Sequence, residues 1–490
     1  MNLKYFAILC LLSFQAKSAI NKVFNFENIS SFQSDTTMGK STTEGMPEVP
    51  TKVILLESDK QSLPNVEIQK VWSHLNESIS WYVSNGQKCR CRDEEKKIRA
   101  KVDSFEGEHK VEYVGDFRGK HIYRLIIPLV RIREGATNRL VQVEVKASNA
   151  KLFSASKKRE RKSIIIVLPN DFAEMKGSIK QYYLQKSFSV HFIEDKEVIS
   201  IREKLRKKIK ELYKSNKVTH TLFVGDSSLI SPYYLDTRFD SATPSDYPYF
   251  KQGDESDHIP DIIGARISIQ SPEQLNGYLK KLSIKNADGP IVSIGVSSNE
   301  GSNPSDYQYV ESILEELSPS TDRYHLNQDN DDSNPTNFVN ILNSGVDLFN
   351  YIGHGSGFAW PSFRREVKVS DLENWRPGRK GPIVLDVACQ NGKFNGRGNI
   401  GETMISGHRK YDYENGALAY VGGSVDISWD PPAIFAQGVS KALGRNSSMS
   451  IGDGVIEGYL YLFQMHSDLE DIIDHLEWTH IQGDPTASMR

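Results

Sequence analysis

The sequence is poor in cysteine and has no strong excess of charge of either sign. Four of its 490 residues are cysteine, which is too few for a scaffold held together by disulfides. The 60 Lys and Arg and 63 Asp and Glu side chains leave a formal net charge of −3, so no global basic field points to a nucleic acid partner. After the N-terminus, no apolar run is long enough to span a bilayer. These absences leave an ordinary globular composition with room for two or three domains.

The N-terminal residues 1–19 have the layout of a secretory signal. Lys4 precedes an apolar stretch over residues 5–14, and small residues follow at Ala16 and Ser18. The alternative, an N-terminal membrane anchor, needs an apolar span longer than about ten residues. We therefore expect an exported protein, secreted or periplasmic, with no membrane span once the signal is removed.

Loss of the signal removes Cys10 and leaves three cysteines in the mature chain. Cys89 and Cys91 lie in a charged stretch and can either pair with each other or remain unpaired. Cys389 is then the odd cysteine of an exported protein, and an odd cysteine in that setting indicates a reactive thiol.

The first part of the chain predicts a small β domain. Residues 20–50 are rich in Ser, Thr and Asn without periodicity and are typical of a flexible leader. Residues 51–156 hold short alternating strands separated by turn signals, which predicts a β-sandwich. The basic run 157–162 follows. It predicts an exposed junction that a protease can cut after Arg159 or Arg161, although a solvated linker that is never cut has the same composition.

Strands and helices alternate over residues 163–490, which predicts a doubly wound α/β domain, with subdomains at 163–285 and 286–490. The segment 201–212 is apolar at every fourth position with basic residues between. It predicts an amphipathic helix with a solvated basic face.

Two apolar strands of this domain stop at reactive side chains. One ends before His354 and the other before Cys389, and parallel strands of an α/β sheet bring such ends to one ligand-binding edge. A cysteine acts as its thiolate, and a neighbouring imidazole supports that state. The backbone N–H groups of Gly355 and Cys389 suit the oxyanion of an acyl-transfer intermediate. The pair predicts nucleophilic thiol chemistry more strongly than either residue alone.

The motifs around these residues resemble the gingipain family of cysteine peptidases. The similar stretches are Asn350–Ser356 and Leu385–Gly392, and the similarity runs from about residue 163 to Gly483–Thr486. Tyr113–Gly119 and Leu125–Pro128 are similar to the family's propeptide domain, more weakly. The resemblance implies a caspase-like peptidase domain with His354 and Cys389 as catalytic residues. It also implies a zymogen, in which the N-terminal all-β domain is an inhibitory propeptide.

The same resemblance gives roles to two carboxylates. Glu300 would support the catalytic histidine, and Asp306 would lie in the specificity pocket. A carboxylate in a partly desolvated pocket suits the planar fork of Arg better than the ammonium group of Lys. The alternative for Asp306 is an N-cap of the helix predicted over 307–317.

Three apolar side chains would complete the pocket on the same resemblance. Trp429 would cover the aliphatic stem of a bound Arg, and Ile352 and Val387 would line the pocket. Simple packing is the alternative for Trp429. Asp386 lies three residues before Cys389, so strand geometry places it on the opposite face and predicts a structural role.

Metal sites receive little support from the sequence. His354, Asp386, His408 and His466 have no tight ligand spacing, so we expect no zinc site. The acidic loops 254–257 and 329–332 carry oxygen ligands suited to a structural calcium ion, although most such loops are solvated turns. No cofactor is expected to be required.

The sequence thus predicts a secreted cysteine endopeptidase that cleaves proteins or peptides after Arg, or after Lys. Its own prodomain is the expected inhibitor, with an arginine inserted into the pocket; the candidates are Arg118, Arg124 and the cluster Arg90–Arg92. Two alternatives remain open: a peptidase-like binding protein without turnover, and a transpeptidase that passes through the same thioester.

Overall fold

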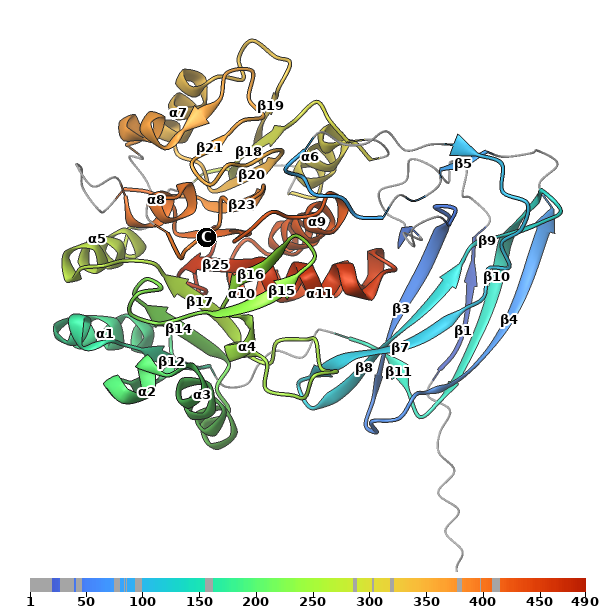
Figure 1. The fold of residues 1–490 in the computed structure, drawn as a ribbon, viewed down its shortest axis with the longest axis horizontal. Coiled ribbons are helices and arrows are strands. Elements are labelled where there is room, and N and C mark those ends of the chain that lie inside the picture. The colour runs from blue at the N-terminus through green and yellow to red at the C-terminus, as the bar shows by residue number, and fades with distance from the viewer. Residues whose placement is uncertain are drawn as a thin grey trace, which may run out of the picture.

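The computed structural model contains a β domain and an α/β domain that lie side by side, the first in blue and cyan and the second in green to red (Figure 1). Within the part of the chain that it describes, no helix is both long and apolar enough to cross a membrane. The described residues are 20–26, 39–40, 46–74, 80–82, 84, 86–92, 99–154, 162–284, 289–301, 304–317, 321–376, 381–396, 398–407 and 415–490.

The β domain is built from two antiparallel sheets. One has the order β1-β10-β4 with β9 paired to β10, and the other has the order β11-β3-β8-β7 with β2 paired to β3. Alternate apolar side chains of both sheets, among them Leu56, Leu125 and Val143, meet in one core. The strands are β1 (Ile20–Asn25), β2 (Gly39–Lys40), β3 (Pro50–Ser58), β4 (Asn65–His74), β7 (Lys110–Phe117), β8 (Lys120–Pro128), β9 (Val130–Arg133), β10 (Ala136–Ser148) and β11 (Lys151–Leu152).

The sheets correct the prediction that residues 20–50 are a flexible leader. Ile20 lies opposite Ala147 along the β1–β10 pair, and β2 pairs with β3. The side chain of Ile20 is buried in the sandwich core. The prediction was wrong for these strands because their pairing with distant strands, rather than a local periodicity, gives them structure.

A ten-stranded sheet forms the centre of the α/β domain, in the order β13-β12-β14-β17-β25-β24-β23-β20-β18-β19. All neighbours are parallel except β24 and β25, so the two halves of the sheet run in opposite directions. The strands are β12 (Ser163–Val167), β13 (Ser189–Ile193), β14 (His220–Val224), β17 (Ile263–Ile267), β18 (Val292–Ser297), β19 (Asp322–Asn327), β20 (Leu348–Ile352), β23 (Ile383–Val387), β24 (Ala419–Gly423) and β25 (Thr479–Gly483).

Helices pack against this sheet, and among the described residues three two-stranded sheets lie outside it. The amphipathic helix predicted over 201–212 is α3, whose Leu205 and Ile209 are buried. These two-stranded sheets are β15 (Tyr233–Thr237) with β16 (Asp240–Ser245), β21 (Ala359–Trp360) with β22 (Val367–Lys368) and, in the N-terminal part of the chain, β5 (Trp81–Tyr82) with β6 (Arg99–Ala100). The helices are η1 (Asn170–Met175), α1 (Lys176–Gln185), α2 (Lys196–Ser200), α3 (Arg202–Asn216), α4 (Tyr247–Phe250), α5 (Pro272–Leu282), α6 (Asp306–Glu315), α7 (Pro335–Ser344), η2 (Val369–Asn374), α8 (Ile400–Ser406), α9 (Asp430–Arg445), α10 (Ile451–Met465) and α11 (Leu469–Trp478).

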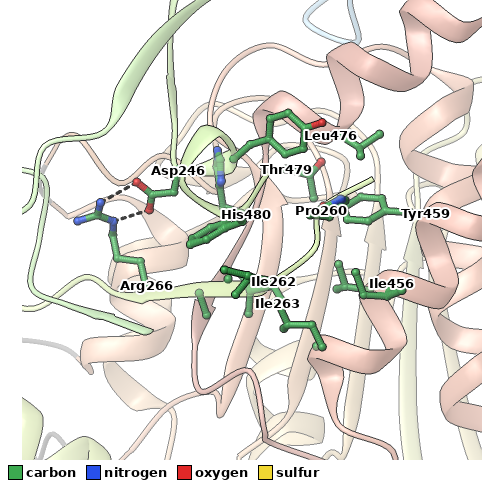
Figure 2. Close-up of a pocket in the computed structure, with 17 residues that line it drawn as sticks. Asp246, Pro260, Ile262, Ile263, Arg266, Ile456, Tyr459, Leu476, Thr479 and His480 are labelled. Carbon is green, nitrogen blue, oxygen red and sulfur yellow. Dashed lines mark hydrogen bonds and ion pairs between the residues drawn. The ribbon is translucent and has the colours of Figure 1, made fainter. Parts of the chain in front are cut away.

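A buried ion pair lies at β17, the strand next to β25 in the sheet. Arg266 on β17 donates from Nε and Nη2 to both carboxylate oxygens of Asp246, at 2.8 and 2.7 Å (Figure 2). Beside the pair lies a cavity of about 40 Å³ with mostly apolar walls, which include Ile262, Ile456 and Tyr459. That volume holds at most a few water molecules, so the cavity is a packing defect rather than a ligand site.

The β domain docks onto the α/β domain through specific polar contacts. Arg124 of β8 is buried and donates to the backbone carbonyls of His466 and Ser467, at 2.9 and 2.7 Å. Gly115 of β7 has φ of +147°, and a Cβ there would lie 2.4 Å from Oδ1 of Asp257, so the close approach requires glycine. The two domains therefore form one packed unit.

Candidate active site

Four neighbouring parallel strands, β18, β20, β23 and β24, end at the same edge of the sheet. The last residues of β20 and β23, Ile352 and Val387, lie opposite each other in register. His354 and Cys389 each follow two residues later, so the sheet brings these two segments together. Glu300 follows β18 in the same way, as predicted for an α/β sheet edge.

The predicted partners His354 and Glu300 are in contact. Nε2 of His354 lies 2.8 Å from Oε1 of Glu300, and Nδ1 lies 2.5 Å from the backbone carbonyl of Arg90. The hydrogen bond to Glu300 raises the pKa of His354 above its usual value, although partial burial opposes the shift. A ring that donates from both nitrogens to these acceptors is an imidazolium.

The backbone of Gly355 lies directly against that of Cys389. A Cβ at position 355 would be 2.2 Å from the carbonyl oxygen of Cys389 and 2.8 Å from its amide nitrogen, so no other residue fits without a backbone shift. An oxyanion hole also needs the N–H groups of Gly355 and Cys389 to point to one position, so the oxyanion role of these two residues stays a prediction.

Cys389 is a buried thiol at the end of its strand. The amide of Ile427 donates to its Sγ over 3.5 Å, and burial raises the pKa of the thiol to about 12. The next residue, Gln390, has φ of +62° and donates from Nε2 to Asp426 at 2.9 Å. In this state the sulfur is therefore a protonated thiol rather than a nucleophilic thiolate.

Asp306 forms the floor of a buried pocket next to these groups. It is the first residue of α6, and its Oδ2 accepts a hydrogen bond from Oγ of Ser298 at 2.7 Å. The N-cap alternative is wrong, because Ser305 caps the helix in a capping box with Gln308. The Asp306 carboxylate is thus available to a cation.

Arg90 of the β domain fills this pocket, and its side chain is 1% exposed. Nη1 donates to Oδ2 of Asp306 at 2.6 Å, and Nη2 donates to the carbonyl of Trp429 at 2.8 Å. The guanidinium carbon lies 4.3 Å from the centre of the Trp429 ring. Trp429 therefore covers the guanidinium of Arg90, whereas the sequence led us to expect contact with the aliphatic stem of a bound Arg. Its ring also lies edge-on to the ring of His354, with the ring centres 5.9 Å apart.

The backbone around Arg90 is held against residues 427–428 by an isolated β-bridge and a backbone hydrogen bond. The amide of Arg90 donates to the carbonyl of Ile427 at 2.7 Å, and Cys89 forms an antiparallel bridge with Ser428. Cys89 and Cys91 form a disulfide across Arg90. The segment thus enters the site with both its side chain and its backbone bound.

The structure separates Arg90 from the other candidate arginines. Arg124 lies in the domain interface described above, and Arg118 lies near the acidic residues Asp453 and Glu457 of α10. Neither occupies the pocket, so the prediction for these two arginines is wrong. The predicted cut sites Arg159 and Arg161 lie outside the described residues.

Other predicted residues have structural contacts. Asp386 accepts hydrogen bonds from Nε1 of Trp360 at 2.7 Å, from Nδ2 of Asn391 at 3.1 Å and from the hydroxyl of Tyr420. These contacts agree with a structural role on the far face of β23. Ile352 and Val387 are buried in the core beside the site.

Potential metal ligands converge at one place within the described residues. The ligand atoms of Cys89, Cys389 and Asp426 lie within 4.8 Å of one another, and neither acidic loop forms such a group. The sulfur of Cys89 is in a disulfide, so it is no thiolate ligand. His408 lies outside the described residues, and His466 binds Asp471 at 2.7 Å.

Two features of the site were not singled out in the sequence. Ser298, which binds Asp306, and the segment 426–428, which binds Cys389 and the Arg90 backbone, become part of the site through tertiary contacts. Their only sequence signal is their position just after β18 and β24.

Together the sheet and the residues at its edge define a caspase-like cysteine-peptidase domain. The chain belongs to peptidase family C25, whose family model matches residues 157–490. The resemblance to gingipains is therefore confirmed.

Individual relatives agree with this assignment. Gingipain R2 of Porphyromonas gingivalis strain W83 is 24% identical over 367 residues, which cover 69% of this chain and 47% of that protein. Gingipain R1 of the same species is 25% identical over 299 residues, covering 56% of this chain and 28% of that protein. The chain thus spans about half or less of the length of these curated relatives.

Solved structures share the fold. The crystal structure of the Arg-specific cysteine proteinase gingipain R superposes with a TM-score of 0.59 at 20% identity, covering 69% of this chain and 80% of that one. A complex of the pro- and mature domains of RgpB from P. gingivalis gives a TM-score of 0.58 at 19% identity, covering 66% and 79%.

Proposed function

We propose that this chain is the zymogen of an exported cysteine endopeptidase that cleaves after arginine, and that residues 20 to about 160 are its inhibitory prodomain. The observation that carries the proposal is Arg90 of the β domain, bound in the Asp306 pocket beside His354. The pocket thus holds the side chain that the proposed substrates would place there.

Arginine fits this pocket better than lysine. The two terminal nitrogens of Arg90 reach different acceptors, the Asp306 carboxylate and the Trp429 carbonyl, while the planar group stacks on the indole. A lysine ammonium is a single point donor without a plane to stack, so it satisfies this site incompletely. The proposed specificity is therefore Arg, with Lys a weaker substrate.

In the open enzyme, the thiolate of Cys389 attacks the backbone carbonyl carbon of the bound arginine itself, and the C–N bond to the next residue breaks to leave a thioester. The backbone N–H groups of Gly355 and Cys389 stabilise the oxyanion. His354, oriented by Glu300, delivers a proton to the leaving amine. Water then hydrolyses the thioester. Ile352 and Val387 keep the strand ends that carry these groups rigid.

The closed state blocks each part of this chemistry. The side chain of Arg90 fills the pocket, and its backbone carbonyl accepts a hydrogen bond from Nδ1 of His354. Burial keeps the Cys389 thiol protonated. Cleavage in the basic run 157–162, after Arg159 or Arg161, would separate the prodomain from the peptidase. A disulfide between Cys89 and Cys91 suits export to an oxidising compartment.

The specificity of the processed protein tests the proposal. Peptide libraries with Arg, Lys or a neutral residue before the cleavage site should show turnover fastest for Arg, slower for Lys, and none for a Cys389→Ala variant. Unchanged turnover in that variant, or no turnover by the processed wild type in the presence of a thiol reductant, would contradict it. Addition of an amine acceptor reveals whether the thioester is hydrolysed or transferred.

A further inference from the structure

The inhibitory segment places a disulfide next to the candidate nucleophile. Sγ of Cys89, Sγ of Cys389 and a carboxylate oxygen of Asp426 lie within 4.8 Å of one another. Cys89 is already bonded to Cys91, so the neighbour of the Cys389 thiol is an electrophilic sulfur. Thiol and disulfide are thus the two reactants of an exchange reaction.

Backbone contacts hold the two reactants in position. Cys89 forms its antiparallel bridge with Ser428, and the amide of Arg90 binds the carbonyl of Ile427. The amide of the same Ile427 binds Sγ of Cys389. Residues 427–428 therefore contact both the backbone of residues 89–90 and the Cys389 thiol, and the buried Arg90 side chain fixes the backbone between the two disulfide cysteines.

The surroundings of the sulfurs favour attack at Cys89. Cys89 is half-buried and faces the buried Cys389, whereas Cys91 is exposed. Exchange at Cys89 therefore releases the sulfur of Cys91 into water, where a thiolate is well solvated and readily protonated.

We propose that Cys389 exchanges with the Cys89–Cys91 disulfide and forms a Cys389–Cys89 bond that links the prodomain covalently to the peptidase. The thiolate of Cys389 attacks Sγ of Cys89, the bond between Cys89 and Cys91 breaks, and Cys91 leaves as a thiolate. The proton lost by Cys389 passes to water, and Cys91 takes one from water. One disulfide is present before and after, so no oxidant is needed.

This covalent link would keep the zymogen inactive in addition to the binding of Arg90 in the pocket. After cleavage in the run 157–162, the prodomain would stay attached until a thiol reductant opens the new disulfide. Burial raises the pKa of Cys389 to about 12, so the thiolate is scarce near neutral pH. The exchange rate should accordingly rise about tenfold per pH unit as the solution becomes more alkaline.

The position of a thiol label tests the exchange directly in the intact zymogen. Samples incubated at pH 7, 8 and 9 are quenched with acid, unfolded with N-ethylmaleimide and mapped as unreduced peptides. Before exchange the label is on Cys389; after exchange it is on Cys91, and a Cys89–Cys389 cross-linked peptide appears. We expect this shift to occur faster at higher pH and at a rate independent of protein concentration.

A label that stays on Cys389 at every pH, with Cys89 still joined to Cys91, would overturn the proposal, as would a rate proportional to protein concentration. In Cys389→Ala the disulfide should persist and no cysteine should be labelled; Cys389→Ser serves if that variant folds poorly. A second readout uses wild type cut in the basic run by an added protease. The two parts should remain together on a gel without reductant and separate with it, and separation without reductant would contradict the link.

The regulatory role of the exchange rests on the proposed function. The position of the thiol label, however, can be measured without any peptide hydrolysis. If the label stays on Cys389 while the processed protein hydrolyses arginyl peptides, only the exchange fails. If the label moves and the processed protein shows no hydrolysis even after a thiol reductant has opened the Cys89–Cys389 disulfide, only the peptidase proposal fails.

Discussion

Two buried arginine–aspartate pairs with different architecture lie in this molecule. Arg266 binds both oxygens of Asp246 and also the carbonyl of Gly225 at 3.1 Å, and all three residues belong to the α/β domain. Arg90 reaches Asp306 from another domain and through one oxygen only. Both arginine side chains are 1% exposed.

The pairs also differ in how completely their donors are satisfied. Within the described residues, Nε of Arg90 has no hydrogen-bond partner, whereas Nε of Arg266 binds Asp246. A buried donor without a partner weakens a contact. We therefore infer that the Arg266–Asp246 pair is a permanent part of the fold, whereas the Arg90–Asp306 pair can separate.

The largest expected effect is on stability. Arg266→Ala leaves the Asp246 carboxylate buried without its partner and should lower the free energy of unfolding by about 3–5 kcal/mol. Denaturant titration of the zymogen measures this. Arg133→Ala, which breaks the exposed Arg133–Glu106 pair, is the control and should leave the free energy of unfolding nearly unchanged. Equal losses in both variants would remove the basis for calling the first pair structural.

The next effect is on specificity. In the processed enzyme, Asp306→Asn should lower kcat/KM for arginyl peptides by about 100-fold or more, because the substrate cation loses its buried counter-charge. Asp246→Asn should lower stability and leave the preference for Arg over Lys unchanged. A changed preference for Arg over Lys in Asp246→Asn, with no change in Asp306→Asn, would show that Asp246 rather than Asp306 sets the specificity.

A smaller effect is expected from Arg90→Lys in the uncut zymogen. The ammonium keeps the charge near Asp306 but loses the second acceptor and the stacking on Trp429, so residual activity on an arginyl peptide should rise about tenfold. The matched control is Arg92→Ala, because Arg92 is exposed and two residues away. If the residual activity of Arg90→Lys equals that of wild type, the positive charge alone is enough to keep residue 90 in the Asp306 pocket.

The smallest effect concerns pH. The hydrogen bond to Glu300 raises the pKa of His354 above 6.5 in the folded protein. A raised folded pKa stabilises the fold fully below the unfolded pKa, and this contribution is lost as pH rises through the folded pKa. The zymogen of wild type should therefore lose its stability advantage over Glu300→Gln as pH increases from 6 to 8. A difference between the two that does not vary with pH would contradict this link.

Much of the site follows from local sequence. Apolar runs that stop at His354 and Cys389 placed both residues at one sheet edge, and the gingipain resemblance assigned Glu300 and Asp306 to contacts that the structure contains. The α/β fold followed from strand and helix periodicity in the same way. These features are encoded within short segments, which is why they could be predicted.

Other features depend on tertiary contacts and were not fixed by sequence. Arg90, Arg118 and Arg124 are equally basic, and only the docking of the β domain places the first in the pocket and the last in the interface. The pairing of Cys89 with Cys91 depends on the local backbone shape. The inclusion of β1 in the sandwich depends on β10, a partner distant in the chain.

The central claim is that Arg90 keeps the peptidase latent, and residual hydrolysis by uncut zymogens tests it most directly. Wild type and Arg92→Ala should show little hydrolysis of an arginyl peptide, while Arg90→Ala should be at least about 100-fold more active without any cleavage in the run 157–162. A Cys389→Ala change added to Arg90→Ala should abolish that activity. The account would be contradicted if the processed wild type is active but the uncut Arg90→Ala zymogen hydrolyses the arginyl peptide no faster than the uncut wild type.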